Sequence, residues 1–185
     1  MVSTVRDLGL IGLVWWAICL HGFAAAPPEY KVKAQLLVNF AACATWPDRT
    51  FDHTNSPVIV GIVGKDPFEG FLEAAVEASS RTRRPGRSLA IRKVSTEAEM
   101  KECHILFFAA SERRRWRDVR QRLKGEPIMT VGETEDFLEQ GGVIKFMLKD
   151  QLVRFDISVD SAKTAQLRLD ARLLSVADTV VGKYD

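Results

Sequence analysis

Residues 58–63 form a continuous run of apolar and small side chains, Val-Ile-Val-Gly-Ile-Val, which ends at Gly64. A strand with one face in water would alternate polar and apolar residues. This run therefore predicts a strand that is covered on both faces of a parallel sheet. A sheet of that kind needs helices on both sides, and this requirement limits the chain to few architectures.

The segments that follow alternate between strand and helix patterns. Further strands are predicted over 89–94, 104–108 and 127–131, and helices over 67–79 and 111–124. Thr96 and Glu99 have the spacing of a capping box, which predicts a short helix between the second and third strands. This alternation is typical of an α/β fold with a mainly parallel sheet.

The last third of the chain changes character. After a short helix over 134–140 and the pair Gly141-Gly142, residues 143–148 and 152–158 are predicted to form a hairpin. A terminal helical stretch over 160–181, broken near 167–170, completes the pattern. The predicted fold class is therefore α/β, with a mainly parallel central sheet flanked by helices and an antiparallel hairpin near its C-terminal edge.

The N-terminal segment has the order of a secretory signal peptide. Arg6 precedes an uncharged apolar run over 8–20, and the small residues Gly22 and Ala24 to Ala26 follow it. The run is too short to span a bilayer core of about 30 Å as a helix. We expect a signal peptide over 1–24, cleaved after Ala24 to Ala26, and a single domain over 25–185; the alternative is an uncleaved N-terminal anchor.

Export to the periplasm would place the remaining cysteines in an oxidising compartment. Cys43 and Cys103 then allow one disulfide, if their Cα atoms lie within about 7 Å. No metal site is predicted, because Cys103 and His104 are adjacent on a strand and point to opposite faces.

The helix predicted over 29–46 carries more apolar surface than one core requires. Its polar residues Lys31, Gln35 and Asn39 form one narrow stripe, and the apolar arc covers roughly 200°. Such an arc indicates burial on two sides, or one side offered to a partner. On the second interpretation, the contact surface is predicted to comprise Val32, Leu36, Phe40 and Cys43. Lys33 lies within the arc, where its stem can reach water.

Patterns that would indicate catalysis are weak. Gly61, Gly64 and Gly70 match no phosphate-binding motif. A small ligand could still bind at the carboxyl ends of the strands, with Gly64, Lys65 and Asp66 as the predicted crevice, by analogy with other α/β folds. Ser111 is explained as a helix N-cap. A hydrolase would require roles for Ser111, Asp66 or His104, and we predict no catalytic residue and no cofactor.

The charge distribution argues against a nucleic-acid partner. The formal net charge is only +2, although arginines cluster over 81–87 and 113–122. The helix arginines point in nearly all directions, and aromatic residues for base stacking are missing around them. A solvated surface is the simpler interpretation.

Five segments together resemble the YfiR-like family of small exported proteins. They are residues 30–47, 58–74, 103–112, 128–162 and 169–177. The resemblance implies a periplasmic α/β protein without known catalysis, often dimeric. It implies repression of a membrane-bound diguanylate cyclase through binding of that enzyme's periplasmic sensory domain, and relief by redox state and by an outer-membrane OmpA-like lipoprotein.

The chain departs from this family at its cysteines. Cys103 matches a cysteine that family members bridge to the first strand, but Gly61 stands at the expected partner position, and the hairpin has no cysteine. The resemblance therefore predicts a periplasmic regulatory binding protein with altered redox control. The alternative is a periplasmic small-ligand-binding module that serves a sensor kinase or a transporter.

Overall fold

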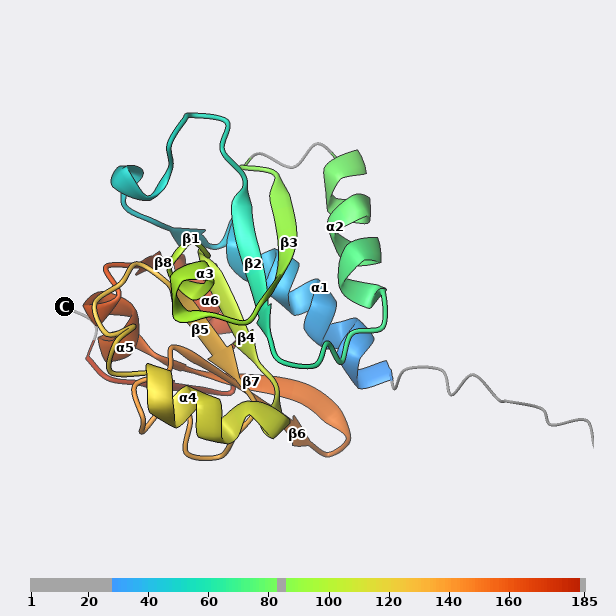
Figure 1. Cartoon of the computed structure of the whole chain (residues 1–185). Helices are drawn as coiled ribbons and strands as arrows, with labels where there is room; N and C mark the ends of the chain where they lie inside the picture. Colours follow the sequence, from blue (N-terminus) through green and yellow to red (C-terminus); the bar gives the residue numbers. More distant parts are fainter. Residues whose placement is uncertain (1–27, 83–85, 184–185) are drawn as a thin grey trace, which may run out of the picture.

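A seven-stranded sheet in the order β3-β2-β4-β5-β6-β7-β9 forms the centre of the computed structural model, which describes residues 28–82 and 86–183 (Figure 1). Its strands are β2 (Val58–Val63), β3 (Leu89–Val94), β4 (Ile105–Phe108), β5 (Met129–Gly132), β6 (Ile144–Lys149), β7 (Leu152–Ser158) and β9 (Thr179–Val181). The predicted signal peptide over 1–24 lies outside the described residues.

The strand directions confirm the predicted fold class. Strands β3, β2, β4, β5 and β6 run parallel, and β7 returns antiparallel to β6 as the predicted hairpin. β9 then pairs parallel with β7 and forms one edge of the sheet. The predicted strands over 58–63 and 89–94 are confirmed to the residue.

Helices cover both faces of the sheet and create two cores. On one face, α1 (Pro28–Ala42) and α2 (Phe71–Arg81) pack together over a cluster that includes Phe40, Phe68 and Phe107. On the other face, α3 (Glu97–Lys101) and α4 (Arg113–Val119) cover a second cluster around Leu106 and Trp116. Shorter elements complete the fold: β1 (Ala44–Thr45), η1 (Asp48–Thr50), η2 (Ala110–Glu112), α5 (Val159–Thr164), β8 (Arg168–Leu169) and α6 (Ala171–Ser175).

The first two helices have different boundaries from those predicted. α1 ends at Ala42 rather than residue 46, because β1 pairs with β8 and the Cys43 carbonyl accepts the Asp170 N–H. α2 begins four residues late, since Asp66 caps the Phe68 N–H and Gly70 takes a left-handed φ of 92°. The capping box of Thr96 is confirmed.

Later helices are shorter than their patterns indicate. The stretch over 111–124 becomes η2, α4 and a series of turns, and 134–140 forms turns rather than an α-helix. There Phe137 lies between Gly132 and Gly142, where an added Cβ would approach the ring to 2.3 Å and 2.2 Å. The stretch over 160–181 is broken as predicted, but it ends in β9 because β7 has a free edge for pairing.

The described residues contain no helix that is both long enough and apolar enough to cross a membrane.

Candidate functional site

Large apolar side chains remain exposed mainly along one edge of the sheet. Leu148 and Leu152 lie at the tip of the β6–β7 hairpin, and each is 55% exposed. Val176, which precedes β9, is 63% exposed, and Val180 and Val181 within β9 are 40% and 50% exposed. We call these five residues the β9-edge surface. By strand register, Leu148 and Val180 lie on the α1 face of the sheet, and Leu152 and Val181 lie on the other face, so these residues line an edge and not one face. Exposed apolar residues concentrated along one edge indicate a protein-interaction site.

The backbone of this edge is also open within the described part of the chain. β9 pairs with β7 on one side, and the sheet ends there. The Lys149 Nζ binds both carboxylate oxygens of Asp178, at 3.1 Å and 3.0 Å, which joins the hairpin tip to the segment before β9. An edge strand with exposed valines can pair with a strand of another protein.

This surface was not predicted from the sequence. The sequence signal for strand β9 is its three consecutive β-branched residues, Thr179, Val180 and Val181, which favour a strand. The helix predicted over 160–181 included these residues, so no strand was expected there. In addition, the local sequence does not indicate which strand lies at an edge of the sheet.

The predicted contact surface on α1 is only partly exposed. Val32 is 46% exposed, and Leu36 and Cys43 are half-buried. Phe40 contradicts the prediction: it is fully buried, with ring centroids 5.7 Å from Phe146 and 5.0 Å from Phe155. Phe40 therefore belongs to the core, and a charged residue there would disrupt folding rather than test a surface.

Burial on two sides explains the wide apolar arc of α1. The helix packs against α2 and against β7, so both flanks of the arc are covered by the protein itself. Figure 1 shows α1 and α2 on the same face of the sheet. The first interpretation of the arc is thus correct for most of its width, and only the stripe around Val32 is left for a partner.

A buried ionic cluster holds the start of α1 over the carboxyl ends of β4 and β5. Lys33, expected to reach water, is 3% exposed and pairs with Glu29 and Glu133. Glu133 also accepts the Ala110 N–H at 2.9 Å and the Tyr30 hydroxyl at 3.3 Å. Burial and the Glu133 carboxylate raise the pKa of Tyr30. The cluster fixes α1 to the sheet.

The crevice predicted around Gly64, Lys65 and Asp66 is occupied by the protein's own side chains. Glu112 lies over Gly64 so closely that an added Cβ would be 2.2 Å from its Oε1. Asp66 accepts the Phe68 N–H at 2.8 Å, and Phe68 is buried. Neither of the two hollows described below is lined by Gly64, Lys65 or Asp66.

Within the described residues, Cys43 and Cys103 are not bridged to each other. Cys103 is buried below α3, and its thiol donates to the Glu99 carbonyl at 3.3 Å. Burial raises the pKa of the Cys103 thiol to about 11. Its Sγ lies against Gly61 of β2, the position that the family resemblance assigns to a bridging cysteine.

His104 is a structural residue with both ring nitrogens engaged. Its Nδ1 accepts the Ile59 N–H at 3.1 Å, and its Nε2 lies 3.3 Å from the Thr50 carbonyl, so Nε2 carries the proton. Phe51 stacks on the ring at 4.4 Å. Burial lowers the pKa of His104, which keeps the ring neutral. His104 and Cys103 line a hollow of about 560 Å³ at the amino ends of the strands.

Metal-binding and nucleophilic arrangements are not present among the described residues. No group of three His, Cys, Asp or Glu side chains there could hold a metal ion. Ser111, predicted as an N-cap, instead lies in η2 with its hydroxyl 3.5 Å from the Glu112 carboxylate, and α4 has no side-chain cap. Ser111, Asp66 and His104 each have a structural partner of their own.

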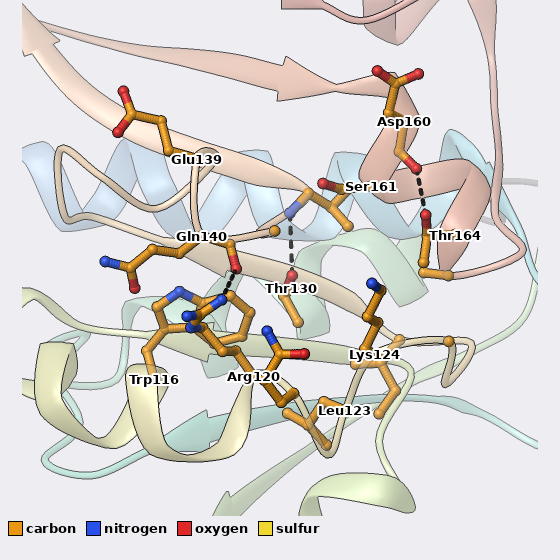
Figure 2. A pocket seen from close by; sticks show the side chains of 16 residues that line it. Trp116, Arg120, Leu123, Lys124, Thr130, Glu139, Gln140, Asp160, Ser161 and Thr164 are labelled. Carbon is orange, nitrogen blue, oxygen red and sulfur yellow. Dashed lines mark hydrogen bonds between the residues drawn. The ribbon is translucent and has the colours of Figure 1, made fainter.

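A second hollow of about 290 Å³ lies between α4, the turns over 134–141 and α5 (Figure 2). Its base is apolar, and Arg120, Lys124, Glu139 and Asp160 carry charges around it. Arg120 Nη1 donates to the Gln140 carbonyl at 3.4 Å across one wall. The volume of this hollow lies at the lower limit of small-molecule sites, which is about 300 Å³.

A model of the YfiR/HmsC-like family matches residues 30–178. No curated protein matches the chain. Among solved structures, it is similar to a conserved domain protein from Vibrio cholerae O1 biovar El Tor, at 8% identity and a TM-score of 0.50. The similarity covers 82% of this chain and 60% of that chain, so this chain spans less than two thirds of the other chain's length. At this identity the likeness shows the fold alone.

Proposed function

Because the chain belongs to the YfiR/HmsC-like family of periplasmic regulators of cyclic di-GMP signalling, we propose that it represses an inner-membrane diguanylate cyclase. It does so by binding the periplasmic sensory domain of that enzyme. The family is regulatory and non-catalytic, and the proposed role requires no catalytic residue in this chain.

The observation that carries this proposal is the β9-edge surface. A binding protein needs apolar side chains that a partner can bury, and Leu148, Leu152 and Val176 supply them along this edge of the sheet. The open edge of β9 adds backbone donors and acceptors for strand pairing. Val32 and the half-buried Leu36 add exposed apolar area on α1, which packs against β7.

Cellular cyclic di-GMP tests the proposal. Deleting the gene should raise the cyclic di-GMP level, and the wild-type gene should restore it. The double variant Leu148→Asp/Leu152→Asp should fail to restore repression, because it places two negative charges in the contact. Both positions are exposed, so the core should remain intact. An unchanged level after deletion would contradict the proposed function.

A matched control distinguishes loss of contact from loss of fold. Lys93→Glu adds negative charge on β3, at the opposite edge of the sheet, and should restore repression fully. Purified double variant and control should unfold at the wild-type temperature. If the double variant is folded and still represses, the assigned surface is wrong.

Two further partners remain predictions from the family. An outer-membrane OmpA-like lipoprotein would relieve repression, and a second copy would form a dimer; sedimentation of the purified protein tests the latter. A second function, a small-ligand-binding module for a sensor kinase or transporter, is favoured by the hollow in Figure 2.

A further inference from the structure

The loop over 47–57 rests on the ring of His104. The loop connects β1 to β2 and contains η1, and Figure 1 shows it in cyan, beyond the amino end of β2. Phe51 stacks on the His104 ring, with the ring centroids 4.4 Å apart and the planes 15° apart. The Thr50 carbonyl accepts the His104 Nε2–H at 3.3 Å. His104 is only 6% exposed, so the loop and the sheet enclose its ring.

A hydrogen bond to β2 requires this ring to be neutral. The His104 Nδ1 accepts the Ile59 N–H at 3.1 Å, and an imidazole nitrogen accepts a hydrogen bond only while it carries no proton. The neutral ring therefore satisfies one group of β2 and one carbonyl of the loop at once. A proton on Nδ1 would place two donors, Nδ1–H and the Ile59 N–H, against each other. The hydrogen bond to β2 would then become a repulsive contact.

The ring cannot leave that contact without moving the loop. Phe51 covers one of its faces, and the Trp46 ring meets it edge-on, with the ring centroids 6.0 Å apart. The main chain of His104 is fixed, because its carbonyl accepts the Met129 N–H at 2.8 Å and the Trp46 indole N–H at 3.2 Å. Protonation of the ring would therefore displace the loop and leave the pairing of β4 with β5 intact.

The charges near the ring do not favour its protonated form. Burial lowers the pKa of His104, the Thr50 carbonyl opposes this effect, and the positive charge of Arg87 adds to it. The guanidinium of Arg87 lies 3.7 Å from the centroid of the Phe51 ring.

The hollow of about 560 Å³ beside the ring has no excess of either charge. Its charged residues are Arg49, Asp52, Arg92, Lys101, Glu102 and Glu126. Arg92 pairs with Glu102, and Lys101 pairs with Glu126. The Cys103 thiol, which also lines the hollow, is neutral because burial raises its pKa to about 11. No carboxylate of the described residues forms an ion pair with the His104 ring, so a protonated ring would have no counter-charge there.

We propose that His104 is an acid-sensitive latch, which holds η1 and Phe51 against the sheet while its ring is neutral and releases them when Nδ1 gains a proton. Histidine is the side chain whose charge ordinarily changes between about pH 5 and 8. Arg49, Thr50 and Asp52 form one wall of the 560 Å³ hollow, so release opens the hollow on that side. The inference does not depend on the proposed function.

The tip of the loop has a separate anchor that does not titrate with the ring. Arg87 Nη1 donates to the carbonyls of His53, Thr54 and Ser56, at 3.1 Å, 2.6 Å and 3.1 Å. Release should therefore be confined to residues 48–52, while residues 53–56 stay attached to Arg87. This difference along one loop distinguishes the latch from general loosening by acid.

Nitrogen NMR of the purified protein tests the latch. At neutral pH the His104 ring should carry its proton on Nε2 and none on Nδ1. As the pH falls, protonation of the ring and loss of order over 49–52 should share one midpoint, below the unfolded pKa of about 6.5. Backbone order parameters over 49–52 should fall below about 0.6, whereas those of Ser56, β4 and β5 should stay near about 0.85.

Two histidine variants form a matched pair. His104→Asn removes the titration but keeps an acceptor near the position of Nδ1, so the order of residues 49–52 should no longer change with pH. His53→Asn removes an exposed histidine from the same loop and should keep the wild-type response to pH. If His104→Asn does not fold, the ring and loop midpoints of the wild-type protein decide the question.

The proposal is overturned if the ring gains a proton while residues 49–52 stay ordered, or if the two midpoints differ. It is also overturned if His104→Asn folds and keeps the wild-type response to pH. Loss of order in β4 and β5 together with the loop would contradict it as well, because acid would then unfold the whole protein rather than release one segment.

Discussion

Gly61→Cys should create a disulfide with Cys103 that the natural chain lacks. A Cβ placed on Gly61 would lie 3.4 Å from the Cys103 Cβ and 2.7 Å from its Sγ. Bridged cysteines have Cβ atoms about 3.5–4.5 Å apart, so a small relaxation gives a normal bridge. The variant therefore restores, at the position that the family resemblance indicates, a link between β2 and the start of β4.

The magnitude follows from the length of chain that the bridge would close. Residues 61–103 form a loop of 43 residues. Loop-closure entropy predicts a stabilisation of about 4 kcal/mol for that length, before any strain. For a chain of this size, 1 kcal/mol corresponds to about 2–4 °C in unfolding temperature, so the oxidised variant should unfold about 10 °C above its reduced form.

The assay compares oxidised and reduced protein of the same variant. Thiol titration in denaturant should find two thiols fewer after oxidation, and thermal unfolding with and without reductant should give the difference. Oxidation should be slow unless catalysed, because the pKa of Cys103 is about 11 and little thiolate is present at neutral pH.

Gly61→Ser is the matched control. Its side chain meets Cys103 and Leu106 Cδ2 at 2.7 Å and 2.8 Å but forms no bond, so it should destabilise the protein by about 1–3 kcal/mol, regardless of reductant. A folded Gly61→Cys variant that keeps all its thiols after catalysed oxidation would refute the contact between β2 and Cys103.

Three further predictions concern the core and its titration. Burial lowers the pKa of His104 in the folded state. The contribution of His104 to stability is therefore fully present above the unfolded pKa of about 6.5 and is lost as the pH falls toward the lowered pKa. His104→Gln should flatten this part of the curve of unfolding temperature against pH. Glu133→Gln leaves Lys33 buried with one carboxylate partner fewer, and it should lower the free energy of unfolding in denaturant by about 3–5 kcal/mol. The double variant Lys33→Met/Glu133→Gln should recover most of this loss. Phe40→Ala should cost about 3–5 kcal/mol, whereas Val32→Ala at the exposed stripe should change stability by less than about 0.5 kcal/mol.

The strands were predictable because their signal is local. Residues 58–63 and 89–94 are apolar runs between turn residues, and the hairpin around Lys149-Asp150-Gln151 carries its own turn. The capping box of Thr96 is also local, since all its hydrogen bonds lie within four residues.

Elements that depend on distant partners were not predictable in the same way. The end of α1 is set by pairing of β1 with β8, more than 120 residues later in the chain. The turns over 134–140 form because the Phe137 ring needs two glycines beside it. Lys33 has the same helical position as an exposed lysine would have, and its burial depends on pairing with Glu133, 100 residues away, in addition to its neighbour Glu29.

The β9-edge surface also depends on residues that are distant in the sequence, so it could not be predicted from local patterns. An apolar arc on a helix shows how much surface is buried but not by what, and α2 and β7 account for nearly all of it in α1. The exposed valines of β9 appear only when the strand order is known. α5 then connects the two candidate sites: Asp160 lines the hollow and lies against Gly182, and Lys163 donates to the Lys183 carbonyl just beyond β9.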